Sequence, residues 1–234
     1  MLSNTQMSRQ NETKSGRTYG GLTQEQRKAA RYKQFLEAGL EVFGTSGFRS
    51  ATVRQLCRQA KLTDRYFYEA FGSLELLLIA VYKCQMDIIQ ERVITAITEV
   101  LPSQEIQHIA DVGLTTFFTG LEDPRIAQVC MVELEGVSLD VSDLYHSYIN
   151  NFADTFSSMA GLFYPTWKIA DDEWKILGIS LVGAMRQAAT YWLLSNYAMD
   201  KKALVKATAK IFLGLIQHID KEQATIPSPP SSTP

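Results

Sequence analysis

The sequence predicts an all-α fold of about nine helices, in which a three-helix N-terminal domain with a helix-turn-helix precedes a larger helical domain. Two observations carry this prediction. From residue 24 to residue 222 apolar side chains recur every three or four positions, and no alternating strand pattern persists. Proline, which ends or begins helices, separates the later segments at Pro102, Pro124 and Pro165.

The first helix is expected at residues 24–45. One of its faces carries an apolar stripe made of Tyr32, Leu36, Gly39, Leu40 and Phe43. A single apolar stripe is typical of a helix that packs one side on a core. The segment TSGF ends this helix, and Gly47 suits the left-handed conformation of a C-terminal cap.

Two short helices follow, and a three-residue turn at residues 61–63 joins them. The first begins at Thr52, because Thr52 and Gln55 have the T-x-x-Q form of a capping box. Its expected buried face consists of Val53, Leu56, Cys57 and Ala60. Thr63 can cap the second, whose Phe67 and Phe71 face the core. This arrangement is a helix-turn-helix, which places its second helix in the DNA major groove.

Tyrosines beside Arg65 make the second of these helices unusual. With Phe67 and Phe71 inward, Tyr66 and Tyr68 point outward. A tyrosine there offers a ring to thymine methyls and a hydroxyl to phosphate oxygens. The alternative is that these tyrosines pack against the first helix or a nearby loop.

The distribution of charge also favours nucleic-acid binding by the N-terminal part. Residues 1–72 hold 12 Lys+Arg against 6 Asp+Glu, whereas the rest holds 11 against 19. A basic first third on an acidic remainder is expected if only that third meets a polyanion. Solvated surface charge would give the same count.

From Phe35 to Leu78 the sequence resembles the tetracycline-repressor (TetR/AcrR) family of bacterial transcription regulators. The resemblance is carried by FLEAGLEVFGTSGF and TVRQLCRQAKLTDRYFYEAFGSLELL. It implies that Tyr68 holds a phosphate, that Thr52 contacts the DNA backbone, and that base edges are read by Thr63, Asp64, Arg65 and Tyr66. Arg65 is expected on guanine or on phosphate.

Two positions depart from the family pattern. Lys61 replaces the glycine of the turn, and Leu74 replaces a lysine that contacts phosphate. The missing anionic contact is expected to be supplied by Arg49, Arg54, Arg58 or Lys61.

Six further helices are expected near residues 74–100, 103–121, 124–135, 138–161, 171–198 and 200–222. The predicted organisation is therefore a disordered basic tail at 1–22, a DNA-binding domain at 23–73, a ligand-binding and dimerisation domain at 74–222, and a disordered tail at 223–234. The resemblance implies that the last two helices form a four-helix bundle across a two-fold axis. The residues expected at that homodimer interface are Gly183, Ala184, Leu204, Ile211, Phe212 and Leu215.

The resemblance also implies a ligand site between the long helix at 74–100 and the middle helices. The candidate lining residues are Phe117, Phe118, Met131, Tyr145, Tyr148, Phe152, Met159, Met185 and Tyr191. The charges expected to be buried with them are Glu133, Glu135 and Arg186, with surface pairing as the alternative. Such a lining suits a lipophilic or aromatic small molecule, although the same pattern also describes plain core.

The predicted function is a cytoplasmic repressor that binds an inverted-repeat DNA operator and is released by this ligand, with the helix at 74–100 as the lever. A regulator without effector, a helical lipid carrier and an enzyme are the alternatives. Catalysis, a metal and a cofactor are not expected, because His108 and Asp111 lack a third ligand and no phosphate-binding loop or nucleophile elbow appears.

The cysteines and the longest apolar run indicate whether the protein is expected in a reducing compartment and whether it is expected to span a membrane. Cys57, Cys84 and Cys130 are far apart and are expected to be buried structural thiols, with redox sensing as the alternative. Arg186 and Gln187 interrupt the run at 176–194, so no membrane span is expected.

Overall fold

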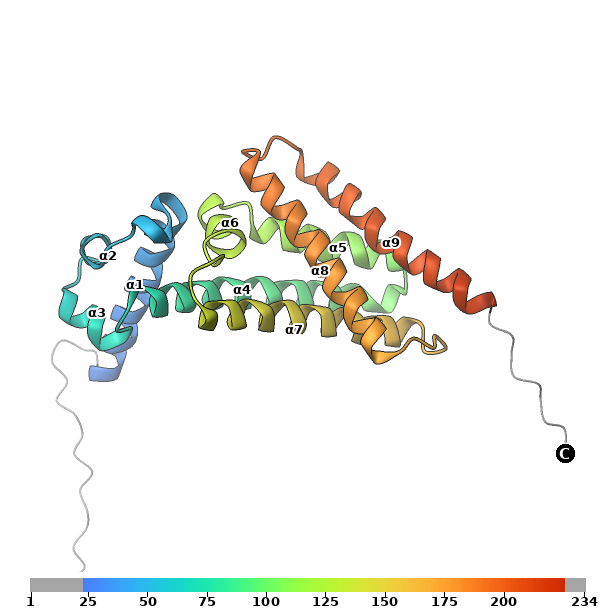
Figure 1. Cartoon of the computed structure of the whole chain (residues 1–234), viewed down its shortest axis with the longest axis horizontal. Helices are drawn as coiled ribbons and strands as arrows, with labels where there is room; N and C mark the ends of the chain where they lie inside the picture. Colours follow the sequence, from blue (N-terminus) through green and yellow to red (C-terminus); the bar gives the residue numbers. More distant parts are fainter. Residues whose placement is uncertain (1–22, 226–234) are drawn as a thin grey trace, which may run out of the picture.

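The computed structural model of the protein describes residues 23–225 and contains nine α-helices and no strand within that range. The first three helices form a compact unit at one end of the molecule, and the other six extend away from it (Figure 1). Their bounds are α1 Gln24–Ser46, α2 Val53–Ala60, α3 Asp64–Ala70, α4 Leu74–Val100, α5 Ile106–Gly120, α6 Pro124–Met131, α7 Leu139–Phe163, α8 Asp171–Leu194 and α9 Lys201–Thr225. Short 3-10 turns lie at Phe48–Ser50 and Leu101–Ser103.

An aromatic cluster holds α1 and α3 together. The ring of Phe35 lies edge-on to Phe67, with centroids 5.6 Å apart, and to Phe71 at 6.0 Å. Leu56 of α2 is fully buried beside them. As predicted, Phe67 and Phe71 are the inward residues of α3.

The apolar stripe of α1 is rotated from the prediction. The buried residues are Phe35, Ala38, Gly39, Val42 and Phe43, whereas Tyr32 is exposed at the edge and stacks on Phe71 at 4.7 Å. The reason is the close approach of α4, since a Cβ on Gly39 would lie 2.7 Å from Val81. Only a face centred near Gly39 allows that contact.

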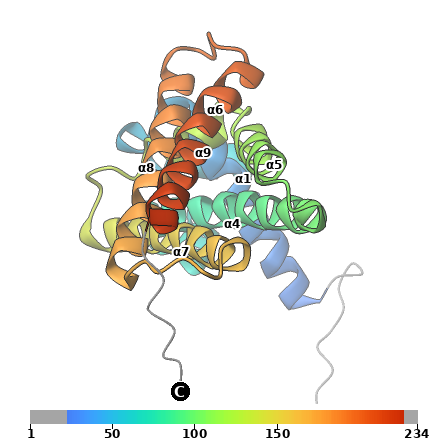
Figure 2. The same cartoon turned by 90° about the vertical axis from the view of Figure 1, so that its right-hand side faces the viewer.

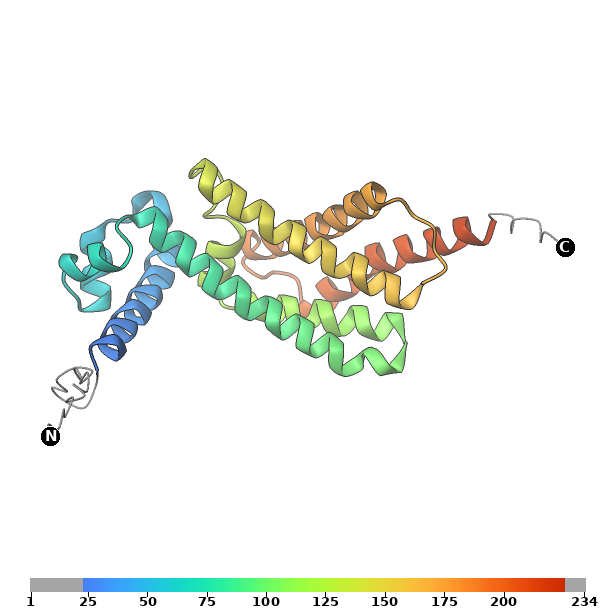
Figure 3. The same ribbon diagram turned by 90° about the horizontal axis from the view of Figure 1, so that it is seen from below.

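Helix α4 leads from the N-terminal unit into the rest of the molecule (Figure 3). Ser73 caps it, accepting the backbone N–H of Leu76 at 3.1 Å. In the end-on view of Figure 2, α8 and α9 are in front, α4 and α5 lie to one side of them, and α7 lies below. The part of α4 farthest from the N-terminal unit packs against α5 and keeps its other side exposed.

Several predicted boundaries differ from the structure. Helix α6 ends at Met131 rather than 135, where the chain turns toward Gly136 with φ 70°, and α8 ends at Leu194 because Asn196 and Tyr197 have positive φ. Helix α9 continues to Thr225, so the tail predicted from 223 begins later. The predicted tail at 1–22, and the remainder of the other at 226–234, lie outside the described residues.

Gly47 ends α1, but not in the predicted left-handed helical conformation. Its φ of 80° and ψ of 152° belong to a region that is essentially restricted to glycine. The backbone leaves α1 extended instead of curling back, which leads directly into the turn at Phe48–Ser50.

Candidate functional site

The turn between α2 and α3 is tight and left-handed. Thr52 caps α2 with the predicted capping box, since its hydroxyl accepts the N–H of Gln55 and its own N–H donates to the Gln55 side chain at 2.9 Å. Lys61 then adopts φ 55° and ψ 36°. A side chain in this region costs about 1–2 kcal/mol, so the strain expected from replacing glycine is present.

The outer side of α3 carries side chains suited to DNA. Tyr68 is 59% exposed and makes an edge contact only with the neighbouring Phe67 ring. Arg65 is exposed, and its Nε donates to Oε1 of Glu69 at 2.8 Å. This hydrogen bond raises the pKa of Arg65 and holds its guanidinium along the helix surface. Thr63 and Asp64 are exposed at the N-terminus of α3, where the side chain of Thr63 accepts no capping hydrogen bond.

Tyr66 does not point away from the protein as predicted. Its ring is half-buried against the core, and the guanidinium of Arg31 lies 4.4 Å from its centroid. The N-terminal half of α1 passes beside α3 and covers this face. Tyr66 therefore packs against the first helix, which was the alternative expectation, and of these two tyrosines only Tyr68 exposes its ring to solvent.

Four basic side chains surround this face. Arg49, Arg54, Arg58 and Lys61 are all exposed, and none of them forms an ion pair with another residue of 23–225. Leu74 is partly buried against the core. The side chain at this position thus packs inward and offers no positive charge to the surface.

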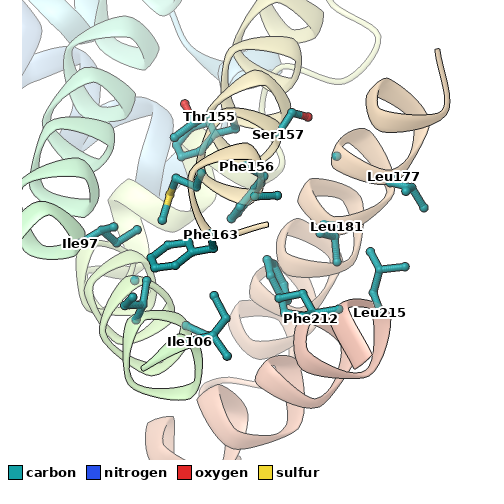
Figure 4. Close-up of a pocket in the computed structure, with 18 of the residues that line it drawn as sticks. Ile97, Ile106, Thr155, Phe156, Ser157, Phe163, Leu177, Leu181, Phe212 and Leu215 are labelled. Carbon is teal, nitrogen blue, oxygen red and sulfur yellow. The ribbon is translucent and has the colours of Figure 1, made fainter. Parts of the chain in front are cut away.

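A cavity of about 110 Å³ lies inside the C-terminal helices, among α4, α5, α7, α8 and α9 (Figure 4). We name it cavity 1. It is lined by Ile97, Ile106, Phe117, Phe156, Phe163, Leu181, Met185, Phe212 and Leu215, with further apolar residues and no charged side chain among the described ones. Thr155, Ser157 and Tyr164 contribute hydroxyl groups, and Gln90 contributes an amide. A space of this size admits on the order of ten water-sized positions and is dry enough for an apolar ligand.

A smaller cavity of about 30 Å³, cavity 2, lies beside it and shares Phe117, Phe152 and Met185 with its lining. Its other walls are Tyr82, Met86, Cys130, Met131, Tyr145, Tyr148, Ile149, Val182 and Arg186. Burial raises the pKa of Cys130 and of Tyr82, and the positive charge of Arg186 opposes both shifts. Burial, and then donation of its hydroxyl to Asp87, raises the pKa of Tyr148.

Seven of the nine predicted lining residues border one of these cavities, and two do not. Phe118 packs edge-on against Trp192, with centroids 6.1 Å apart, and Tyr191 is 62% exposed. The inner face of α8 runs through Met185, Ala189 and Trp192, which puts position 191 on the opposite side. Neither Glu133 nor Glu135 lines a cavity, whereas Arg186 does.

Glu133 instead joins the C-terminal helices to the N-terminal unit. Its Oε2 accepts the backbone N–H of Phe48 at 2.6 Å, and its Oε1 accepts the amide of Gln128 at 2.6 Å. Nearby, Arg125 of α6 donates to Glu41 of α1 at 2.7 Å. Sequence reasoning missed this junction, because Glu133 and Phe48 are 85 positions apart and Glu133 belongs to no motif.

The outward face of α8 and α9 carries exposed apolar and small side chains beside polar ones such as Ser180, Gln187 and Lys210. Exposed apolar or small residues at helical spacing are Ile176, Gly183, Tyr191, Leu194, Ile211 and Gly214. Of the predicted interface residues, Gly183 and Ile211 lie on this face and Ala184 lies at its edge. Leu204 and Phe212 are buried within the chain, and Leu215 lines cavity 1. Leu204, Phe212 and Leu215 therefore pack within the chain rather than on the outward face.

The cysteines are less buried than expected. All three cysteines are free thiols, but only Cys130 is buried, whereas Cys57 and Cys84 are partly exposed. No cluster of three His, Cys, Asp or Glu side chains able to hold a metal occurs in this range, and Asp111 accepts a hydrogen bond from Gln107. Across these same residues, no helix is long and apolar enough to cross a membrane.

A helix-turn-helix joined by one long helix to an apolar cavity defines the class of DNA-binding transcriptional regulators. Residues 35–81 match the family described as bacterial regulatory proteins, tetR family. The N-terminal unit of the chain is thus similar to transcriptional regulators of that family.

Known relatives resemble the chain along most of its length. The fatty acid metabolism regulator protein of Bacillus subtilis (strain 168) is 21% identical over 192 residues, which cover 82% of this chain and 98% of that protein. Similar solved structures are the fatty acid degradation regulator FadR from Bacillus halodurans, with TM-score 0.69, 18% identity and coverages of 79% and 95%, and the regulator FadR from Bacillus subtilis in complex with stearoyl-CoA, with TM-score 0.66, 19% identity and coverages of 77% and 96%.

Proposed function

We propose that the protein is a cytoplasmic repressor that binds an inverted-repeat operator as a homodimer and is released by a lipophilic ligand held in cavity 1. One observation carries this proposal: α4 begins directly after the recognition helix α3, and its distal residues Val93, Ile94 and Ile97 line cavity 1. A ligand that moves these residues also moves the first turn of α4, because a helix transmits displacement along its axis.

Contact with DNA is assigned to the outer face of α2 and α3. Tyr68 donates its hydroxyl to a phosphate, and Thr52 and the surrounding cations add sequence-independent attraction. Arg65 reads a base edge, for which it must leave Glu69. That exposed pair is worth little, so the exchange costs less than a contact to guanine returns.

Dimerisation is assigned to the uncovered face of α8 and α9, centred on Gly183 and Ile211. Small residues there let two helix pairs approach closely, and the large apolar side chains Ile176, Tyr191 and Leu194 otherwise remain in water. A two-fold dimer sets its recognition helices about 34 Å apart, on successive major grooves of an inverted repeat.

The ligand class follows from the walls of cavity 1. With no charged lining residue and many branched or aromatic ones, the cavity favours a long apolar chain. The relative solved with stearoyl-CoA, an acyl thioester, supports an acyl chain as the apolar part. Reversing a two-state equilibrium takes about 5.5 kcal/mol, which burial of about seven methylene groups supplies.

The operator and its release can be tested together. Selection from random duplex DNA with the purified protein should return an inverted repeat, and fluorescence anisotropy then measures affinity for that site. Dodecanoate should weaken operator binding by at least about tenfold. Binding that no acyl compound changes would leave a constitutive regulator, and absence of any duplex binding at modest ionic strength would refute the proposal.

A further inference from the structure

Cavity 2 contains a buried cation with few partners. The side chain of Arg186 is only 13% exposed. Its Nη2 donates to the carbonyl oxygen of Met131 at 2.6 Å, and the guanidinium lies 4.5 Å from the centroid of the Tyr145 ring. Among residues 23–225, this is its only hydrogen bond, although a guanidinium carries five N–H donors.

The charge of Arg186 is also poorly balanced. The nearest carboxylate is that of Glu135, whose Oε1 is 3.9 Å away and whose side chain is 77% exposed. Such a long, solvated pair contributes little. A cation removed from water needs a close anion for compensation, so the site favours an anionic ligand.

A second donor lines the same cavity. Tyr82 of α4 is only 2% exposed and lines cavity 2. Its hydroxyl can donate a hydrogen bond, whereas the hydroxyl of Tyr148 already donates to Asp87.

The dimensions of cavity 2 restrict what that acceptor can be. About 30 Å³ holds two or three water-sized positions, which matches a carboxylate group. A larger polyanionic head would not fit inside. The shared lining residues Phe117, Phe152 and Met185 place this group directly beside the apolar space of cavity 1.

From this geometry we propose that cavity 2 is the head-group site of the effector, where Arg186 and Tyr82 bind the carboxylate of a free long-chain carboxylic acid whose chain occupies cavity 1. This inference rests on the proposed function, since it names the polar end of the same ligand. Arg186 also holds the last turn of α6 through Met131, two positions before Glu133. A carboxylate that draws Arg186 away from that carbonyl acts on the junction with the DNA-binding unit.

The test compares two ligands of equal chain length, dodecanoate and methyl dodecanoate. Binding to the full-length protein is followed by the fluorescence of Trp167 and Trp174, which line cavity 1. Arg186→Met should weaken dodecanoate binding about 10–100-fold and leave the ester within about twofold, because only the acid loses a charge-assisted hydrogen bond. Tyr82→Phe, which removes one oxygen atom, should weaken dodecanoate about 3–10-fold. The matched control is Arg92→Met, an exposed arginine of α4 outside both cavities.

The outcomes separate this inference from the proposed function. Wild-type protein that binds acid and ester equally, with no effect of Arg186→Met or Tyr82→Phe, overturns the head-group site and leaves cavity 1 intact as an apolar site. Equal loss of both ligands in Arg186→Met indicates a structural role and also overturns it. Dodecanoyl-CoA that binds more tightly than dodecanoate, without dependence on Arg186, assigns the head group elsewhere. Wild-type protein that binds neither ligand contradicts the proposed effector itself.

Discussion

The contact of Glu133 with the N-terminal unit gives the sharpest prediction about coupling between the two ends of the molecule. Replacing Glu133 by alanine leaves the Phe48 N–H and the Gln128 amide without their acceptor. A hydrogen bond to a charged group contributes about 1.5–3 kcal/mol, and the site is only partly buried. We therefore expect Glu133→Ala to lower the free energy of unfolding by about 1–2 kcal/mol.

Urea unfolding at fixed protein concentration measures this change, since a dimer's stability depends on concentration. Glu91→Ala, at an exposed site on α4, is the matched control and should change stability by less than about 0.5 kcal/mol. In Glu133→Ala, dodecanoate should also change operator affinity less than it does in the wild-type protein. If Glu133→Ala and Glu91→Ala are equally stable and respond equally to the ligand, the junction does not couple the two parts.

Four further substitutions test the assigned surfaces. Tyr68→Ala should reduce affinity about 2–10-fold on every duplex alike in anisotropy titrations, with dimerisation unchanged, and undiminished binding would reject its phosphate contact. Arg65→Ala should relax base preference at one or two operator positions, by about 1–3 kcal/mol in a selection assay, and a uniform loss would make it a phosphate contact. Lys61→Gly should raise the free energy of unfolding by about 1 kcal/mol, because glycine adopts the left-handed conformation without strain. The same variant should bind DNA with a weaker dependence on salt concentration, because one cation that contacts phosphate is lost. Ile211→Glu should shift the protein to monomer in sedimentation velocity, and a retained dimer would place the interface elsewhere.

The N-terminal unit was predictable because its signals are local. The capping box of Thr52 and the inward pair Phe67 and Phe71 each depend on residues within four positions. The long helix from Leu74 to Val100 was predicted with both ends correct. One error in this region arose because another element intervenes: α1 covers Tyr66. The conformation of Gly47 and the missing cap hydrogen bond of Thr63 are local errors.

The two cavities were only partly predictable. Aromatic and methionine residues on a helix indicate burial, but they do not distinguish cavity wall from solid core. Met185 and Phe118 look alike in sequence, yet one lines both cavities and the other packs against Trp192. The partners of Arg186 and Glu133 were beyond sequence reasoning for the same reason.

The sequence by itself determined the all-α class, the helix-turn-helix and the resemblance of residues 35–81 to the tetR family, since helix periodicity, caps and turn chemistry act between residues close in the chain. Only the tertiary structure decided which face of α9 is buried, where the cavities open and that Glu133 meets Phe48. These features depend on the angles and distances at which separate helices pack, and many packings are compatible with the same periodic pattern.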